Sequence, residues 1–491
     1  MPEARIVVVG AGPAGLATAL ALARRGRAVT VLDRDPEQPI DDPPTAYDTW
    51  NRPSVPQSPQ PHSLLGRTRR ALKRNAPDVL DGVLAAGAWE NDLRVRLIKE
   101  AAQPGDEDLV AIHCRRPVFE SVLRRAVTQE PLVTLLPEEP AVGLELHGSN
   151  LPRVKGVKLA GSTLAADVVI DASGRRTPAP RWLGDAGVDL PPVRTEPCGI
   201  VYYSRYFRLV DDADYPDWIG VLGPAGTTDS TRFSIFFGDN RTFAIVLGVL
   251  ATEPRFKALA REPAYMQVLA RFRSLAPFAQ DEVSRPITGV LAMGSLSNVY
   301  RSPLLDGRPP VLGLHFVGDA YCHTNPLFAW GLCLGVDHGF ELGRIIHEHP
   351  EDLESQALAF ASLTGAEAEQ CYEAVAEEDR DRTLTWNGQQ PTGRWLGRGF
   401  AGFVRQCVSP AVLVDPEVAR ATLRRANLLD PPAELQDRDD IIRRVAELQD
   451  TVPRPQPGAF PTREEILELI QASNSEGLSA RRRHSGEYES S

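Results

Sequence analysis

Three glycines near the N-terminus, Gly10, Gly12 and Gly15, have the spacing of a loop that binds a dinucleotide. In such a loop the first glycine permits a tight turn, the second lets the backbone approach a pyrophosphate, and the third lets the next helix pack on the strand. The positions between them are filled by Ala11, Pro13 and Ala14. We therefore predict that residues 10–15 bind phosphates at the N-terminus of a helix.

An acidic residue follows where such a site binds the ribose. The strand-like run 28–32 ends at Asp33, about 20 residues after the first glycine, and Arg34 comes next. A carboxylate at this position accepts hydrogen bonds from ribose hydroxyls and repels a 2′-phosphate. The sequence therefore predicts FAD or NAD rather than NADP, with Asp33 and Arg34 at the adenosine end of the site.

The elements that must position these residues are a β-branched strand at 6–9, a helix that begins near Pro13, and the strand that precedes Asp33. Later strands near 167–170 and 311–317 end in Asp171-Ala172-Ser173-Gly174 and Gly318-Asp319-Ala320. Between them the composition changes to aromatic, strand-like runs. We predict one discontinuous nucleotide-binding domain at 1–190 and 306–350, an inserted domain at 191–305, a helical region at 351–473 and a disordered tail at 474–491.

Composition excludes several classes of partner. The chain has 491 residues, of which 42% are hydrophobic and 24% charged, and its net charge is −11. An acidic chain favours neither nucleic acid nor an anionic membrane, and no apolar run reaches membrane-spanning length. The six cysteines form no C-x-x-C pair, so we expect free thiols and no metal site. Without a visible signal peptide, we expect a cytoplasmic protein.

Three further segments are interpreted from their residue patterns. The proline-rich stretch 36–61 is long for a loop in a compact domain, which indicates either disorder or function. The alternation in Leu93-Arg94-Val95-Arg96-Leu97-Ile98 favours a strand. A helix is also expected at 117–128. It would begin with Pro117, and proline is tolerated in the first turn of a helix.

Taken together and in this order, the Gly10 turn, the Asp171 motif and the Gly318-Asp319 motif resemble the FAD-dependent monooxygenase family with the aromatic-hydroxylase (PHBH-like) fold. The resemblance covers about residues 5–350. It implies an α/β fold in which a Rossmann-type FAD-binding domain carries an inserted antiparallel β-sheet substrate domain, followed here by a helical C-terminal region. It also implies FAD as the cofactor and NAD(P)H as the electron donor.

The resemblance assigns further residues to the FAD site. Arg116 matches an arginine that heads a helix and reaches the FAD phosphates, and Asp319, after Gly318, matches the aspartate that holds the ribityl chain. Pro326 and Gly331 match the segment that runs beside the isoalloxazine ring. His62 and His323 are the histidines nearest the expected flavin edge. Either could act as an acid or base, but a hydrogen-bonded structural role is favoured for each, so neither is assigned as catalytic.

Some residues point to a subgroup and to a departure from the family. Val55-Pro56-Gln57 and His62 are similar to a segment of bacterial oxidoreductases of natural-product pathways, including polyether epoxidases. Ser173 stands where the aromatic hydroxylases have an aspartate that also serves NAD(P)H. Direct reduction by NAD(P)H and reduction through a separate flavin reductase therefore both remain open. Trp330 is expected to narrow access to the ring.

The function that the resemblance implies is insertion of one oxygen atom from O₂ into an apolar or aromatic small molecule, by hydroxylation or epoxidation. A flavin-dependent halogenase would need a Trp-x-Trp-x-Ile-Pro segment, and no two tryptophans of this chain lie two positions apart. A FAD dehydrogenase or reductase on the same fold remains an alternative. A non-catalytic dinucleotide-binding protein is the alternative from a different class.

Overall fold

The computed structural model describes residues 4–37, 42–148, 150–218, 223–452 and 460–473, so the tail predicted at 474–491 lies outside the described residues. At the centre of the first layer is a parallel sheet with the strand order β18-β9-β1-β2-β5. Its members are β1 (Ile6–Val9), β2 (Val29–Leu32), β5 (Val133–Leu136), β9 (Val168–Asp171) and β18 (Leu314–Phe316). The runs are almost entirely apolar because helices and other strands cover both faces of this sheet.

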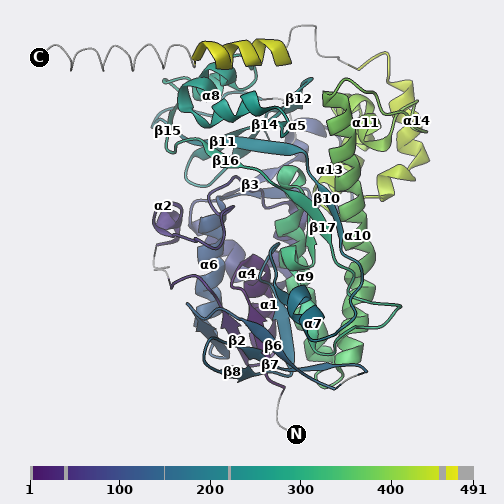
Figure 1. The fold of residues 1–491 in the computed structure, drawn as a ribbon. Helices are drawn as coiled ribbons and strands as arrows, with labels where there is room; N and C mark the ends of the chain where they lie inside the picture. The colour runs from purple at the N-terminus through teal and green to yellow at the C-terminus, as the bar shows by residue number, and fades with distance from the viewer. Residues whose placement is uncertain (1–3, 38–41, 149, 219–222, 453–459, 474–491) are drawn as a thin grey trace, which may run out of the picture.

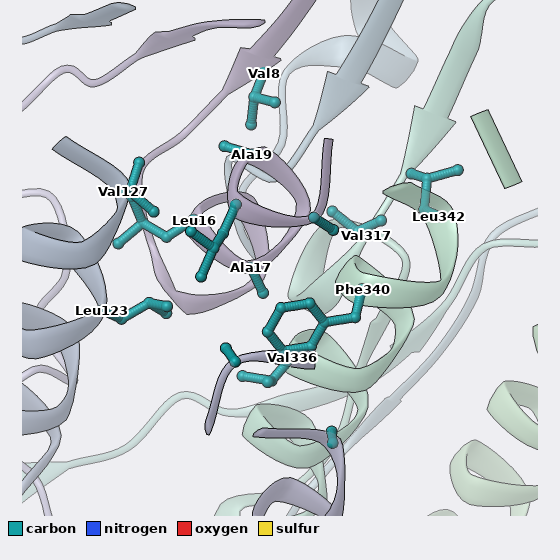
Figure 2. Close-up of a cluster of buried hydrophobic side chains, with 14 of the residues drawn as sticks. Val8, Leu16, Ala17, Ala19, Leu123, Val127, Val317, Val336, Phe340 and Leu342 are labelled. Atoms are coloured by element: carbon teal, nitrogen blue, oxygen red, sulfur yellow. The ribbon is translucent and has the colours of Figure 1, made fainter. Parts of the chain in front are cut away.

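Three helices pack together beside the parallel sheet: α1 (Pro13–Ala23), α6 (Arg116–Gln129) and α9 (Trp330–Glu348). Figure 2 shows Leu16 of α1 between Leu123 of α6 and Phe340 of α9. The closest approach is between α1 and α9. A Cβ added at Gly339 would lie 2.7 Å from the Ala14 carbonyl oxygen, and one at Gly343 would lie 2.5 Å from the Ala21 Cβ.

The second layer is an antiparallel sheet in the order β12-β13-β14-β11-β15, with β16 also paired to β11. Its strands are β11 (Ile200–Leu209), β12 (Ala225–Thr227), β13 (Thr231–Phe237), β14 (Thr242–Leu250), β15 (Ser284–Pro286) and β16 (Leu291–Met293). Along β13, Phe233, Ile235 and Phe237 face a buried aromatic core that α8 (Glu262–Leu269) covers. Arg232 and Ser234 alternate with them, so they lie on the other face.

A small sheet and a long helix join the two layers, as Figure 1 shows. The sheet consists of β10 (Arg194–Pro197), β17 (Ser297–Tyr300) and β19 (Cys322–His323). The helix is α10 (Leu353–Trp386), which begins with the Asp352 side chain accepting a hydrogen bond from the Ser355 amide. The remaining elements of this part are α2 (Ala46–Thr49), α3 (Gly66–Asn75), α4 (Pro77–Ala85), α7 (Ala179–Asp185), β3 (Trp89–Asp92), β4 (Val110–His113), β6 (Gly143–His147), β7 (Arg153–Lys158) and β8 (Thr163–Ala165).

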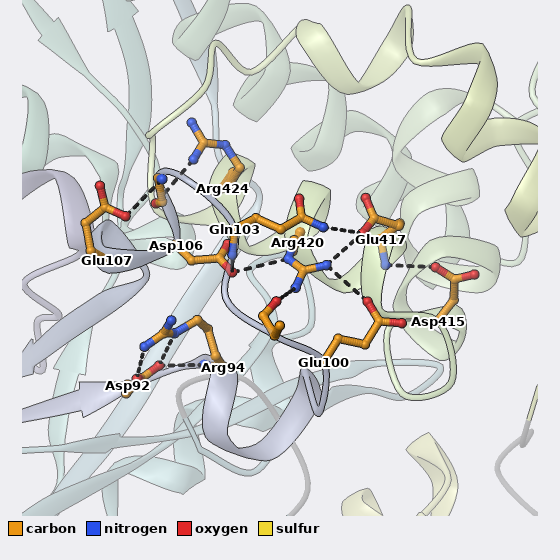
Figure 3. Close-up of polar contacts among 12 residues, drawn as sticks. Asp92, Arg94, Glu100, Gln103, Asp106, Glu107, Asp415, Glu417, Arg420 and Arg424 are labelled. Atoms are coloured by element: carbon orange, nitrogen blue, oxygen red, sulfur yellow. Dashed lines mark hydrogen bonds and ion pairs between the residues drawn. The ribbon is translucent and has the colours of Figure 1, made fainter.

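The last helix of the C-terminal region packs on the aromatic core of the antiparallel sheet through Ile466 and Ile470, and the rest of the region packs against residues 93–111. The region contains α11 (Phe400–Phe403), α12 (Ser409–Ala411), α13 (Pro416–Ala426), α14 (Asp439–Glu447) and a helix at 463–473. Figure 3 shows the polar part of the contact with residues 93–111, in which Arg420 lies 3.3 Å from Asp106 and 3.4 Å from Glu100. The predicted α/β architecture, with a parallel sheet, an antiparallel sheet and a helical C-terminal region, is confirmed.

The prediction of a strand at 93–98 is wrong, because Arg94–Leu97 forms the helical turn α5. The Asp92 carboxylate accepts a hydrogen bond from the Arg94 amide at 3.0 Å and pairs with the Arg94 guanidinium at 2.6 Å. These local contacts favour a turn over an extended chain. Within the described ranges, no helix is both long and apolar enough to cross a membrane.

Candidate active site

One cavity of about 740 Å³ lies at the carboxyl ends of the parallel strands. The end residues Val9, Leu32 and Val317 line it, together with the segment 52–62. This is where open α/β sheets bind their ligands. Of the residues predicted from the sequence, the following line the cavity: Gly10, Ala11, Gly12, Pro13, Ala14, Asp33, Arg34, Arg116, Gly318, Asp319, Pro326 and Gly331.

The three glycines of the turn have different roles. Packing requires a glycine at two of the positions and leaves space for a side chain at the third. Gly10 has φ of +107°, and an added Cβ would lie 2.5 Å from the Ala172 carbonyl oxygen. Gly15 does not line the cavity; its Cβ would lie 2.0 Å from the Gly10 carbonyl oxygen, so it is needed for packing. At Gly12, the nearest described atom to an added Cβ is Glu120 Oε1, at 3.9 Å. The open space at Gly12 fits the close approach of a phosphate group.

At the predicted adenosine end, the Asp33 carboxylate already pairs with two arginines. Arg52 lies 3.2 Å and Arg124 3.1 Å from Asp33 Oδ2, and all three side chains are buried. Arg52 also lies 2.8 Å from Asp35. The two guanidinium groups compensate the negative charge of Asp33. The predicted repulsion of a 2′-phosphate depended on that charge. Arg52 was not predicted, because it lies in the proline-rich stretch and no spacing pattern marks it.

The proline-rich stretch is thereby part of the cavity wall. Arg52, Ser54 and Gln57 all line the cavity. Asp35 holds the stretch in place, since its carboxylate accepts hydrogen bonds from the Ser54 hydroxyl at 2.7 Å and the Ser54 amide at 3.0 Å. Further along, the Gln60 side chain accepts a hydrogen bond of 2.8 Å from the Ser204 hydroxyl of β11. The segment therefore joins the cavity to the antiparallel sheet.

Arg116, at the start of α6, brings a cation to the same cavity. Its guanidinium donates to Glu120 Oε1 at 3.2 Å and lies 3.4 Å from His62 Nε2. His62 Nδ1 lies 2.8 Å from the Gln60 carbonyl oxygen, which can only accept, so Nδ1 carries the proton and Nε2 accepts from Arg116. Burial, followed by the positive charge of Arg116, lowers the pKa of His62 to about 4. The imidazole is therefore neutral at physiological pH.

The Gly318-Asp319 loop lies beside the glycine turn and the helix that follows it. A Cβ at Gly318 would lie 2.9 Å from the Ala14 Cβ, so the two loops are in contact. Asp319 Oδ2 lies 3.3 Å from His323 Nδ1. Although burial alone would raise it, the pKa of Asp319 is lowered by His323. An ionised carboxylate here can accept hydrogen bonds from the hydroxyl groups of a ligand.

Ser173, which replaces the aspartate of the family motif, is held by Asp171. Asp171 Oδ1 accepts hydrogen bonds from the Ser173 hydroxyl at 2.6 Å and from the Ser173 amide at 2.9 Å, and Thr177 donates to the other oxygen. Burial raises the pKa of Asp171. Ser173 therefore shapes the turn on the cavity wall. Arg175, two positions later, also lines the cavity.

Trp330 does not narrow the cavity, so that expectation is wrong. It is fully buried, does not line the cavity, and its indole N–H donates to the Ala426 carbonyl oxygen at 3.1 Å. Its ring packs against the C-terminal region because the backbone turns at Ala329, which has φ of +56°. Leu332 and Gly331, which follow it in α9, line the cavity instead.

The segment before Pro326 is anchored by a buried network. Asn325 Oδ1 accepts a hydrogen bond from the Tyr202 hydroxyl at 2.6 Å, and Asn325 Nδ2 donates to Asp379 at 2.7 Å. Asp379 in turn pairs with Arg382 at 2.7 Å. The network links β11 and α10 to the part of the cavity where the ring of a flavin was predicted.

Comparison with known proteins agrees with this architecture. Residues 5–39 match the family described as FAD dependent oxidoreductase. Protein Rv3254 of Mycobacterium tuberculosis is 28% identical over 460 residues, which cover 87% of this chain and 90% of that protein. The 6-hydroxy-3-succinoylpyridine 3-monooxygenase HspB of Pseudomonas putida is 29% identical over 179 residues, 35% of this chain and 41% of that protein.

Solved structures share the fold at low identity. The flavin-dependent brominase Bmp2 has a TM-score of 0.58 at 13% identity, with 91% of this chain and 99% of that chain covered. PqsL of Pseudomonas aeruginosa, a probable FAD-dependent monooxygenase, has a TM-score of 0.56 at 14% identity, with 78% and 98% covered. These structures confirm the predicted fold, and the match at residues 5–39 is to a family of the predicted class, FAD dependent oxidoreductase.

Proposed function

We propose that this chain is a FAD-dependent monooxygenase that inserts one oxygen atom from O₂ into an apolar or aromatic small molecule, by hydroxylation or epoxidation, in a bacterial biosynthetic pathway. The observation that carries the proposal is that the Gly10 turn and the Asp319 loop, far apart in the sequence, line one cavity with Pro326 and Gly331. The name of the partial relative HspB supports oxygenation.

Within this proposal the chain has three tasks, while bound FAD supplies the redox chemistry with O₂. The N-terminus of α1 and the Arg116 guanidinium bind the pyrophosphate. Asp319 binds hydroxyl groups of the ribityl chain. The segment 52–62 and the network around Asn325 close the ring end of the cavity and exclude water from the reacting atoms.

The proposal is tested by loading the purified protein with FAD and supplying NADH, a flavin reductase and candidate aromatic and polyene substrates under ¹⁸O₂. We expect a product that is heavier by one labelled oxygen atom, and no product when FAD is left out. A protein that binds FAD and oxidises the substrates without incorporating label is a dehydrogenase and contradicts the proposal.

The electron donor is tested separately, by anaerobic mixing of the FAD-loaded protein with NADH or NADPH. Ser173 stands where an aspartate would serve NAD(P)H, and its hydroxyl is already hydrogen-bonded to Asp171. We therefore propose that electrons arrive through a partner flavin reductase. We therefore expect slow bleaching of the flavin by either nicotinamide, and fast bleaching once a flavin reductase is added. Fast bleaching by NADH or NADPH alone shows direct reduction.

Flavin-dependent halogenation is a second candidate, because the brominase Bmp2 shares the fold over 91% of this chain. The same assays with bromide or chloride decide between the two. A brominated or chlorinated product would favour this candidate, while oxygenation that is unaffected by either halide favours the monooxygenase.

A further inference from the structure

A second, much smaller cavity of about 30 Å³ adjoins the first below the antiparallel sheet. Gln60, Pro61, Met293 and Pro326 line both cavities, so the small one opens at the predicted ring end of the large one. A cavity of this volume has room for at least one water-sized group. The space fits a small polar head group of a substrate whose carbon skeleton lies in the larger cavity.

Arg232 lines the small cavity from β13, and its guanidinium makes no close ion pair with a described carboxylate, although Glu378 attracts it. Its Nε is buried without a hydrogen-bond partner. Burial lowers the pKa of Arg232 from its ordinary value, although arginine remains charged. The net lowering shows that the attraction of Glu378 compensates the desolvation of this guanidinium only in part, and an anion entering the cavity would offset the rest.

The carboxylates of the neighbouring helix α10 are already paired with other arginines. Glu378, which attracts Arg232 most strongly, lies 3.3 Å from Arg405. Arg405 also pairs with Asp381 at 3.0 Å, and Asp379 pairs with Arg382. Each acid of this cluster is therefore in a close ion pair with an arginine other than Arg232.

The other side chains of the small cavity fit the same head group. Ser234, two positions from Arg232 on the same face of β13, presents a hydroxyl that can donate to an anion. The Tyr202 hydroxyl uses its proton for Asn325, so its oxygen can only accept a hydrogen bond. The anion is thus placed toward Arg232 and Ser234, and away from Tyr202.

We infer that the substrate carries a carboxylate, which enters the small cavity and pairs with the Arg232 guanidinium while its carbon skeleton lies at the ring end of the larger cavity. The planar fork of arginine matches the two oxygens of a carboxylate and is the side chain best suited to bind it in a partly buried site. This inference rests on the proposed function, because it makes Arg232 a determinant of substrate specificity for that reaction.

The experiment measures binding to the FAD-loaded protein by titration calorimetry, with benzoate, cinnamate and octanoate as probes and their uncharged amides as controls. The variants are Arg232→Gln, which removes the charge, and Arg232→Lys, which keeps it. Arg208→Gln removes a charge from an exposed position of β11 on the same sheet and is the matched control.

We expect at least one carboxylate to bind the wild type and Arg208→Gln equally, roughly 10- to 100-fold more weakly to Arg232→Gln, and with intermediate affinity to Arg232→Lys. The matching amide should bind the wild type as weakly as the carboxylate binds Arg232→Gln. Unchanged FAD content in each variant shows that the fold is intact.

The inference is overturned if none of the carboxylates binds the wild type, if Arg232→Gln binds them as the wild type does, or if bromide or chloride displaces them and binds more tightly. Failure to take up FAD would instead contradict the proposed function. Repeating the titrations on the protein without FAD separates the two, since Arg232 is contributed by β13 and not by the cofactor.

Discussion

Gly12 and Gly15 belong to one motif, but the chain needs them for different reasons. Gly15→Ala places a Cβ 2.0 Å from the Gly10 carbonyl oxygen, so we expect a loss of about 1–3 kcal/mol in the free energy of unfolding. Gly12→Ala meets no described atom closer than 3.9 Å, so we expect unchanged stability without FAD and FAD affinity weakened roughly tenfold or more. Urea unfolding and FAD titration of both variants check this. Equal FAD affinity in Gly12→Ala and wild type would contradict the phosphate-binding role.

His62 gives the protein a pH dependence of known sign. Its pKa in the fold is about 4, below the ordinary value of 6.5, so the unfolded chain binds more protons between these values. The stability that neutral His62 contributes is present above pH 6.5 and is lost as the pH falls toward 4. A shift of this size corresponds to at most about 3 kcal/mol. We expect the urea midpoint of His62→Gln to fall less steeply across this range than that of the wild type.

At the residue scale, what could be predicted depended on whether a role is encoded locally. The glycine turn and Asp33 were predictable, because their spacing follows from the geometry of a strand, a turn and a helix. Arg52 and Arg232 were not. Arg52 reaches Asp33 from a stretch without periodicity, and Arg232 is distinguished only by the absence of a partner, which depends on where α10 places its carboxylates.

At the scale of elements, the contact between α1 and α9 determines the distance between the two loops of the cavity. Gly339→Ala brings a Cβ within 2.7 Å of the Ala14 carbonyl oxygen, which must push the helices apart. We expect a loss of about 1–3 kcal/mol in the free energy of unfolding and weaker FAD binding, because α9 also carries Gly331. Gly184→Ala in α7, where a Cβ meets nothing within 4 Å, is the control: it should leave FAD affinity unchanged and should not lower the free energy of unfolding, because alanine favours a helix. Similar behaviour of the two variants would refute this account.

The same contact shows why elements were only partly predictable. The apolar run after Pro326 is typical of a helix, and α9 begins at Trp330. That Gly335, Gly339 and Gly343 face α1 is a tertiary property that no local pattern predicts. Conversely, the alternation at 93–98 indicated a strand, but the Asp92 carboxylate favours a helical turn, and packing against the C-terminal region buries Leu93 and Ile98.

At the scale of the whole molecule, the cavity depends on how the antiparallel sheet is attached to the parallel layer. Arg115, directly before α6, and Asp239, between β13 and β14, form an ion pair of 2.7 Å in which both side chains are almost completely buried. Asp239 also accepts a hydrogen bond of 2.8 Å from the Arg115 amide. Removing one partner leaves the other charge buried, whereas removing both does not.

We therefore expect Asp239→Asn and Arg115→Met each to lower the free energy of unfolding by about 3–5 kcal/mol, and the double variant to lose clearly less than the sum of the two. Urea unfolding of the wild type and the three variants measures this coupling. FAD affinity should follow the same order, because Arg115 directly precedes Arg116 and a loosened sheet displaces the arginine that faces the cavity. Additive losses of stability would show that the two charges act independently, and that the sheet is held on α6 by the apolar contacts around them.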